Sequence, residues 1–239
     1  MLFRNTSRND DNMNIEFNGD KIGLVDAVKF LGVHIDCYLN WKHELTSIEG
    51  SISSACYALR SLRDELNLDN LKMVYYALVE SRLRYSIMFW GQSHEYNIKK
   101  AFTCQKRAIR TMARIAPWDS CREHFIRLGI LTVPCLYVFV LLTNLAKKLP
   151  RYESPDDKKA RNKTRRRDIR IDTLNARLKI ARHSARYQAV LLYNKLPTDL
   201  KQIDEITKFK NSLRIFLLKR CFYSVDDFIN FRNVHDILF

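Results

Sequence analysis

The chain has 239 residues, of which 46% are apolar and 11% aromatic, enough for a buried core, and this excludes a wholly disordered chain. Six glycines and five prolines are too few for a turn-rich β-sandwich and favour helices. A surplus of 41 Lys and Arg over 26 Asp and Glu gives a formal charge of +15, so a polyanion is the first partner to consider. The alternative is a basic surface without a partner.

The cysteines and apolar runs bear on where the protein resides. Six cysteines occur without a CxxC pair, and the first ten residues lack the apolar core of a signal peptide. We therefore expect reduced thiols and an intracellular protein, with nucleus and cytoplasm both left open. The longest apolar run, "ILTVPCLYVFVLL", contains Pro134 and is shorter than the roughly 20 residues of a membrane span. It predicts a core helix and no membrane partner.

Residues 1–36 have the pattern of a small antiparallel β unit. Asn18-Gly19 lies between short alternating runs, which is a strong signal for a tight hairpin. The stretch "VKFLGVHID", residues 28–36, alternates as a half-buried strand does, with Gly32 at its centre.

The period becomes helical after residue 40, with Asn40 as the expected N-cap. Helices are predicted over residues 40–66, 69–90, 95–116, a short segment capped by Ser120 and Glu123 and ended by Gly129, and residues 132–147. The predicted class is mainly α: a β remnant, then a helical bundle, then further helices.

Between Lys147 and Arg170 the helical periodicity of apolar residues is lost, and the segment contains eleven basic and four acidic residues. We expect a basic linker over residues 148–175. Apolar periodicity returns after it, so the predicted division is 1–36 for the β unit, 37–147 for the bundle, 148–175 for the linker and 176–239 for a helical C-terminal region.

The predicted third helix has the clearest functional pattern. At about 100° per residue, its basic side chains fall within roughly a third of the circumference, opposite an apolar arc. They are Lys99, Lys100, Lys106, Arg107, Arg110 and Arg114, and no acid lies among them. Such a stripe suits a phosphate backbone and predicts binding of nucleic acid without sequence specificity. A solvated basic face is the alternative.

The sequence offers little for catalysis or metal binding. Of three Asp-Asp pairs, two lie in polar loops, and Asp226-Asp227 follows Ser224 in the pattern of a helix cap. His34 with Cys37 and Cys121 with His124 are too far apart in the chain for a zinc module. No phosphate loop or nucleophile elbow is present. We therefore predict no catalytic residue, no metal ligand and no small-molecule substrate.

Six segments, in order, resemble the C-terminal part of reverse transcriptases from non-LTR (LINE-type, jockey-like) retrotransposons. They are "KFLGVHIDCYLNWKHEL", "YYALVESRLRYSIMFWG", "QKRAIRTMA", "LGILTVPCLYVF", "LYNKLPTDLK" and "FKNSLRIFLLKRCFYSVDDF". The resemblance implies a primer grip at Phe30, Leu31 and Gly32, and a helical thumb that holds RNA/DNA template–primer duplex. A glycine inside a strand would let the primer backbone approach closely.

The resemblance also implies what this chain lacks. Family members carry an aromatic-x-Asp-Asp hairpin upstream of the grip, and Mg²⁺ serves the complete enzyme. We expect Met1 to be an internal methionine of a longer ancestor, and the chain to be a fragment that binds duplex without catalysis and without a cofactor of its own. Two alternatives stay open: a basic helical interaction or structural protein, and an enzyme whose acids come from a separate chain.

Overall fold

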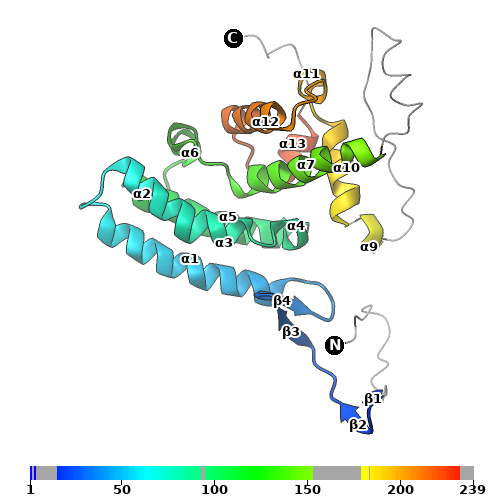
Figure 1. Ribbon diagram of the computed structural model, residues 1–239. Coiled ribbons are helices and arrows are strands. Elements are labelled where there is room, and N and C mark those ends of the chain that lie inside the picture. The colour runs from blue at the N-terminus through cyan, green and yellow to red at the C-terminus, as the bar shows by residue number, and fades with distance from the viewer. Residues whose placement is uncertain (2, 4–14, 93–94, 153–178, 183, 232–239) are drawn as a thin grey trace, which may run out of the picture.

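The computed structural model describes residues 1, 3, 15–92, 95–152, 179–182 and 184–231. The fold is mainly α, as predicted, with two small β-hairpins before the helices (Figure 1). The strands are β1 (Ile15–Phe17), β2 (Asp20–Ile22), β3 (Ala27–Phe30) and β4 (Val33–Asp36). The helices are α1 (Lys42–Leu62), α2 (Leu68–Tyr75), the π-helical η1 (Tyr76–Glu80), α3 (Ser81–Arg84), α4 (Ile87–Trp90), α5 (Glu95–Ala113), α6 (Arg122–Leu128), α7 (Val133–Tyr152), α9 (Lys179–Arg182), α10 (Ala185–Asn194), α11 (Thr198–Lys201), α12 (Ile206–Arg220) and α13 (Val225–Ile229).

The first hairpin forms where the sequence predicts it. Strands β1 and β2 pair antiparallel, with Ile15 opposite Ile22. Asn18 and Gly19 form the turn with φ of 52° and 85°, the left-handed conformations that a two-residue hairpin needs. In Figure 1 this hairpin is the part of the described chain that lies farthest from the helices.

The predicted strand over residues 28–36 is wrong, because this stretch is a second hairpin. Phe30 pairs with Val33, and Leu31 and Gly32 form the turn with φ of 48° and 82°. Because the turn has two residues, the apolar side chains of one face occupy even positions before the turn and odd positions after it, and Val28 pairs with Ile35. This change from even to odd apolar positions is the feature of the sequence that could have predicted the hairpin. Gly32 therefore serves a turn and does not lie inside a strand.

The start of α1 also differs from the prediction. Trp41, with φ of 61°, occupies the N-cap position and makes no capping bond, so Asn40 is not the cap. The side chain of Asp36 instead accepts hydrogen bonds from the backbone N–H groups of Tyr38, Asn40 and Trp41 at 3.1, 2.9 and 2.7 Å. A carboxylate at the end of β4 thus organises the turn before the helix.

The predicted helix over residues 69–90 is interrupted. Tyr85 is extended and Ser86 has φ of 55°, which separates α3 from α4. Helix α5 ends at Ala113, and Arg114 follows with φ of 56°. The predicted capping box of Ser120 and Glu123 does not form: Cys121 occupies the N-cap of α6, and the Ser120 hydroxyl accepts a long hydrogen bond from Arg122 N at 3.4 Å. Gly129 ends that helix as predicted.

A single apolar core runs from Trp41 to Phe228. Helices α1 and α5 pack along each other, and α7 contacts α5, α10 and α12, so the C-terminal helices share the core of the bundle. Figure 1 shows α5 and α7 between α1 and α12, with α5 nearer α1 and α7 nearer α12. The division into four regions stays a prediction, and most of the expected linker falls on residues 153–178, outside the described part.

The described helices can also be compared with the dimensions of a membrane span. None of them alone has the necessary length and apolarity, although α6 together with residues 133–148, bent by 47°, reaches both.

Candidate nucleic-acid interface

Helix α5 separates an apolar face from a basic one. Ala108 and Ile109 on the inner face are fully buried. None of the six cations is buried: Lys99, Arg107 and Arg114 are exposed, and Lys100, Lys106 and Arg110 are half-buried. The outward direction predicted from the helical period therefore agrees with Lys99, Arg107 and Arg114, whereas the other three side chains are only partly exposed.

The cations at the two ends of the stripe lie beside α1. The ammonium group of Lys100 is 2.7 Å from the Glu49 carboxylate, and this hydrogen bond raises the lysine pKa. Arg114 forms an ion pair with Asp64 and donates to the Arg63 carbonyl at 3.0 Å. Two of the six cations thus have acids beside them from α1 and the turn after it, which α5 considered alone could not reveal.

Lys106 and Arg110 contact groups outside α1, and Lys99 lines a pocket. Arg110 donates to the backbone carbonyl of Asp119, in the loop after α5, at 3.1 Å, and the Lys106 ammonium lies 4.8 Å from the centre of the Phe102 ring. Lys99 lines a 290 Å³ pocket together with Tyr137. These contacts give Lys106 and Arg110 structural roles besides any role in binding.

Arg107 lies in the middle of the stripe and differs from its neighbours. Its side chain is exposed, and no ion pair or side-chain hydrogen bond joins it to another described residue. An exposed guanidinium without an acid can neutralise an external phosphate at little desolvation cost.

The second predicted set lies at the tip of the β3–β4 hairpin. Phe30 and Leu31 are 61% and 75% exposed, which leaves both side chains open to a partner. The Leu31 carbonyl accepts a hydrogen bond from the Tyr85 hydroxyl. At Gly32 a Cβ atom would meet only the Tyr85 side chain at an ordinary 3.7 Å, so the positive φ and not lack of space requires glycine.

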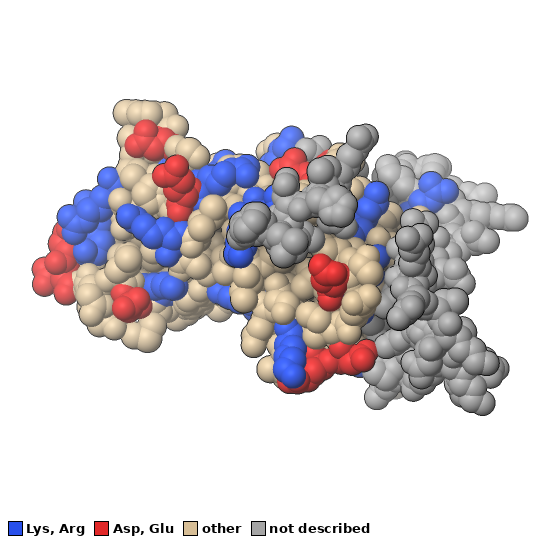
Figure 2. Space-filling model, turned by 90° about the horizontal axis from the view of Figure 1, so that it is seen from above, with Lys and Arg blue, Asp and Glu red and all other residues tan. Residues whose placement is uncertain are grey.

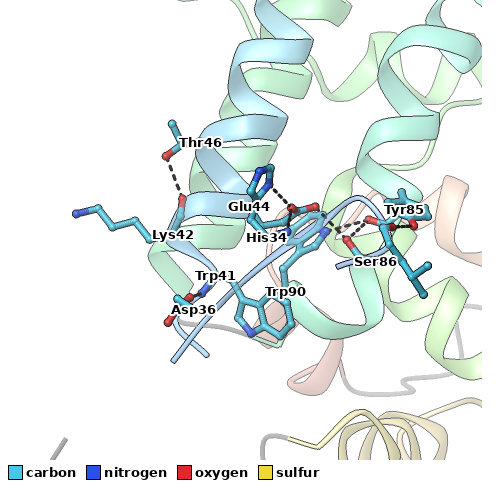
Figure 3. Close-up of polar contacts among 10 residues, drawn as sticks. His34, Asp36, Trp41, Lys42, Glu44, Thr46, Tyr85, Ser86 and Trp90 are labelled. Carbon is cyan, nitrogen blue, oxygen red and sulfur yellow. Dashed lines mark hydrogen bonds and ion pairs between the residues drawn. The ribbon is translucent and has the colours of Figure 1, made fainter. Parts of the chain in front are cut away.

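The hairpin is anchored by residues that the sequence analysis missed. The buried Glu44 carboxylate accepts from the backbone N–H of His34 at 2.8 Å and from the Ser86 hydroxyl at 3.2 Å (Figure 3). Its Oε2 is also 3.3 Å from His34 Nδ1. The amphipathic pattern of α1, with an acid on its inner side, was the signal that could have found Glu44.

The two predicted sets do not form one cluster, because the hairpin lies beside the N-terminal ends of α1 and α5 whereas the stripe runs along α5 to Arg114, which pairs with Asp64 after the C-terminal end of α1. The Asn97 side chain in the first turn of α5 donates to the Asn40 carbonyl at 3.0 Å, which ties α5 to the segment after β4. The hairpin tip itself contacts Tyr85, which precedes α4.

The Asp-Asp pairs and the His and Cys residues were the sequence's candidates for catalysis and metal binding. Asp227 accepts from the backbone N–H of Ser224 at 3.0 Å, while the Ser224 hydroxyl accepts from Asp227 N at 2.9 Å, which confirms the predicted helix cap. Within the described ranges no three His, Cys, Asp or Glu side chains gather into a metal-binding group. Asp10-Asp11 and Asp156-Asp157 lie outside those ranges.

Basic and acidic side chains are mixed on the face of the molecule that Figure 2 shows. Figure 2, which views the molecule from above relative to Figure 1, shows Lys and Arg side chains interspersed with Asp and Glu. The surplus of positive charge therefore does not form one continuous field on that face.

By its geometry the protein is a mainly helical chain with one basic helix face and two β-hairpins. Over 107 residues the chain is 28% identical to the RNA-directed DNA polymerase from mobile element jockey of Drosophila funebris. The match covers 44% of this chain and 12% of that protein. No protein-family model and no solved structure matches the chain. The similarity supports a relationship with the reverse transcriptases of non-LTR elements.

Proposed function

We propose that the chain is a fragment related to non-LTR reverse transcriptases that binds RNA/DNA template–primer duplex without sequence specificity. The observation that carries the proposal is the outward basic face of α5, with exposed Arg107 at its centre, in a chain similar to an RNA-directed DNA polymerase. Nucleic-acid partners follow in general from that relationship, and the duplex is our more specific choice.

In this proposal α1 to α5 act as a thumb-like bundle. The cations Lys99, Lys100, Lys106, Arg107, Arg110 and Arg114 contact phosphates, most strongly where no acid competes. Phe30, Leu31 and Gly32 form a primer-grip-like tip, where exposed apolar side chains can rest against a sugar-phosphate backbone.

The proposal assigns no catalysis and no metal to this chain. The Mg²⁺ of the related polymerases needs convergent carboxylates. The described Asp226-Asp227 pair does not fit that need, since Asp227 is engaged in a helix cap. We therefore expect duplex binding to persist in EDTA, without added Mg²⁺.

The test is duplex binding by the full chain at several salt concentrations. Fluorescence anisotropy with a labelled RNA/DNA duplex should give an affinity that falls steeply with salt. The triple variant K99Q/K106Q/R107Q should reduce the slope of log affinity against log salt by about 0.9 for each phosphate that is no longer neutralised. The control R82Q/K195Q/K219Q removes the same charge from α3, the end of α10 and α12 and should bind like the unaltered chain.

A basic interaction or structural protein is the second candidate, favoured by the pairing of Lys100 and Arg114 with the acids Glu49 and Asp64. It predicts that the triple variant and its control bind duplex equally. Absence of binding at low salt, or affinity independent of salt, would rule out the first proposal.

A further inference from the structure

We infer that Arg60 of α1 and Arg107 of α5 together bind one phosphate group of a nucleic-acid strand at the seam where these two helices pack. The inference rests on the proposed function and deepens it, because it adds α1 to the binding surface and assigns a definite phosphate position. The seam is defined here by residues 49–64, in α1 and the turn after it, and residues 100–114, in α5 and its C-terminal end.

Two ion pairs fix how the helices align along this seam. Glu49 pairs with Lys100 at one end, and Asp64 pairs with Arg114 at the other. The helices therefore run parallel, and both Arg60 and Arg107 fall between the two pairs. Arg107 is seven residues, or two helical turns, from Lys100 and from Arg114, which is about 10.5 Å along the axis of α5.

Both arginines are exposed, and neither guanidinium group forms an ion pair or a hydrogen bond with another described residue. The acids that face the seam, Glu49 and Asp64, already have the cations Lys100 and Arg114. Two guanidinium groups without a counter-charge repel each other, and an anion placed between them relieves that repulsion.

Helical spacing places Arg60 on the side of α1 that faces α5, because Arg60 follows the buried Cys56 by one turn and Glu49 by three turns. Burial raises the pKa of Cys56, and the charges of Arg107 and Arg60 both act to lower it. Both guanidinium groups therefore lie within electrostatic reach of Cys56. Arginine forks are suited to hold phosphate oxygens in paired hydrogen bonds.

An exposed aromatic ring favours a nucleic-acid strand over free phosphate as the source of the anion. Tyr57 precedes Arg60 by three residues on the same side of α1 and is 73% exposed. Rings beside cations are the usual composition of surfaces along which a nucleic-acid backbone runs, because sugars and bases pack on the ring.

The first experiment compares R60Q/R107Q with R82Q/K219Q by anisotropy of labelled RNA/DNA duplex across salt. We expect R60Q/R107Q to lower the salt slope by about 0.9 in total, for the one phosphate that the two arginines share, whereas the control keeps the slope of the unaltered chain. If the unaltered chain binds duplex but R60Q/R107Q keeps its slope, the inference fails while the proposed function stands. If the unaltered chain does not bind, the proposed function fails first.

The second experiment avoids substitutions. Phenylglyoxal modification of the unaltered chain, read by peptide mass spectrometry, should be slowed at Arg60 and Arg107 by duplex but not at Arg82. Inorganic phosphate at the same concentration of phosphate groups should protect neither. Equal protection by inorganic phosphate would overturn the assignment to a nucleic-acid strand, and no protection by duplex would overturn the subsite.

Discussion

Gln105 and Arg107 are two residues apart on α5 and have opposite environments. Arg107 is exposed, while Gln105 is completely buried. The Gln105 amide group donates to the Tyr75 hydroxyl and to the Leu131 carbonyl, and its oxygen accepts from Val133 N, each at 2.8 Å. One side chain thus satisfies buried polar groups from α2, α7 and the loop before it.

We expect Gln105→Leu to lower the free energy of unfolding by about 2–4 kcal/mol, because it leaves several buried polar groups without partners. Urea denaturation followed by circular dichroism measures the decrease. Thr103→Ala, on the outward face of the same helix, should change stability by less than about 0.5 kcal/mol. Equal midpoints for the two variants would show that the Gln105 bonds are not needed.

At the scale of elements, the β3–β4 hairpin depends on the helices for its position. All four residues of β3 are exposed, and the side-chain hydrogen bonds that hold the hairpin come from Glu44 on α1 and from Tyr85 between α3 and α4. Val33 and Ile35 of β4 also pack against the core. The exposed strand edge has no further partner among the described residues. We therefore expect residues 15–30 to exchange their amide protons faster than the helices.

Glu44→Ala combined with Tyr85→Phe should release the hairpin without unfolding the bundle. The His34 N–H and the Leu31 carbonyl are then left without partners, so amide exchange over residues 33–36 should accelerate while that of α7 stays unchanged. Hydrogen exchange with mass spectrometry is the measurement, and Glu65→Ala, an exposed acid after α1, is the control. Weaker duplex binding by the released variant would support the role proposed for Phe30, Leu31 and Gly32. Unchanged exchange would contradict the anchoring.

At the scale of the whole molecule, all six cysteines are free, buried thiols, and all but Cys37 belong to the one apolar core. Burial raises the pKa of Cys135 to about 12 and that of Cys221 to about 11, from an ordinary value of 9.0. These thiols lie where α7 meets the end of α12, since Cys135 Sγ is 3.7 Å from the Phe222 carbonyl. Their protonation is therefore coupled to the packing of the C-terminal helices on the bundle.

The protein should become less stable as pH rises above about 9. The unfolded chain then releases thiol protons that the folded chain keeps, so unfolding is favoured until the folded thiols also ionise. Urea midpoints at pH 8, 9 and 10, under reducing conditions, give the slope. The variant C135A/C221A should flatten it, and an identical slope would show that these thiols do not cause the effect.

Helical class, the turn at Asn18-Gly19 and the cap at Ser224 were predictable because each depends on residues close together in the chain. The outward basic face of α5 was predictable for the same reason. The second hairpin was missed because Leu31 is an unusual residue for a left-handed turn position. The break at Ser86 was missed because local periodicity continues through it.

By itself the sequence determined which faces of the helices are apolar and which carry charge, since both follow from a period of 3.6 residues. Only the tertiary structure decided that Glu49 and Asp64 neutralise Lys100 and Arg114, and that no acid of the seam is left for Arg60 and Arg107. These pairs join residues about fifty positions apart in the chain. Their distances depend on how the whole core packs, which no local pattern contains.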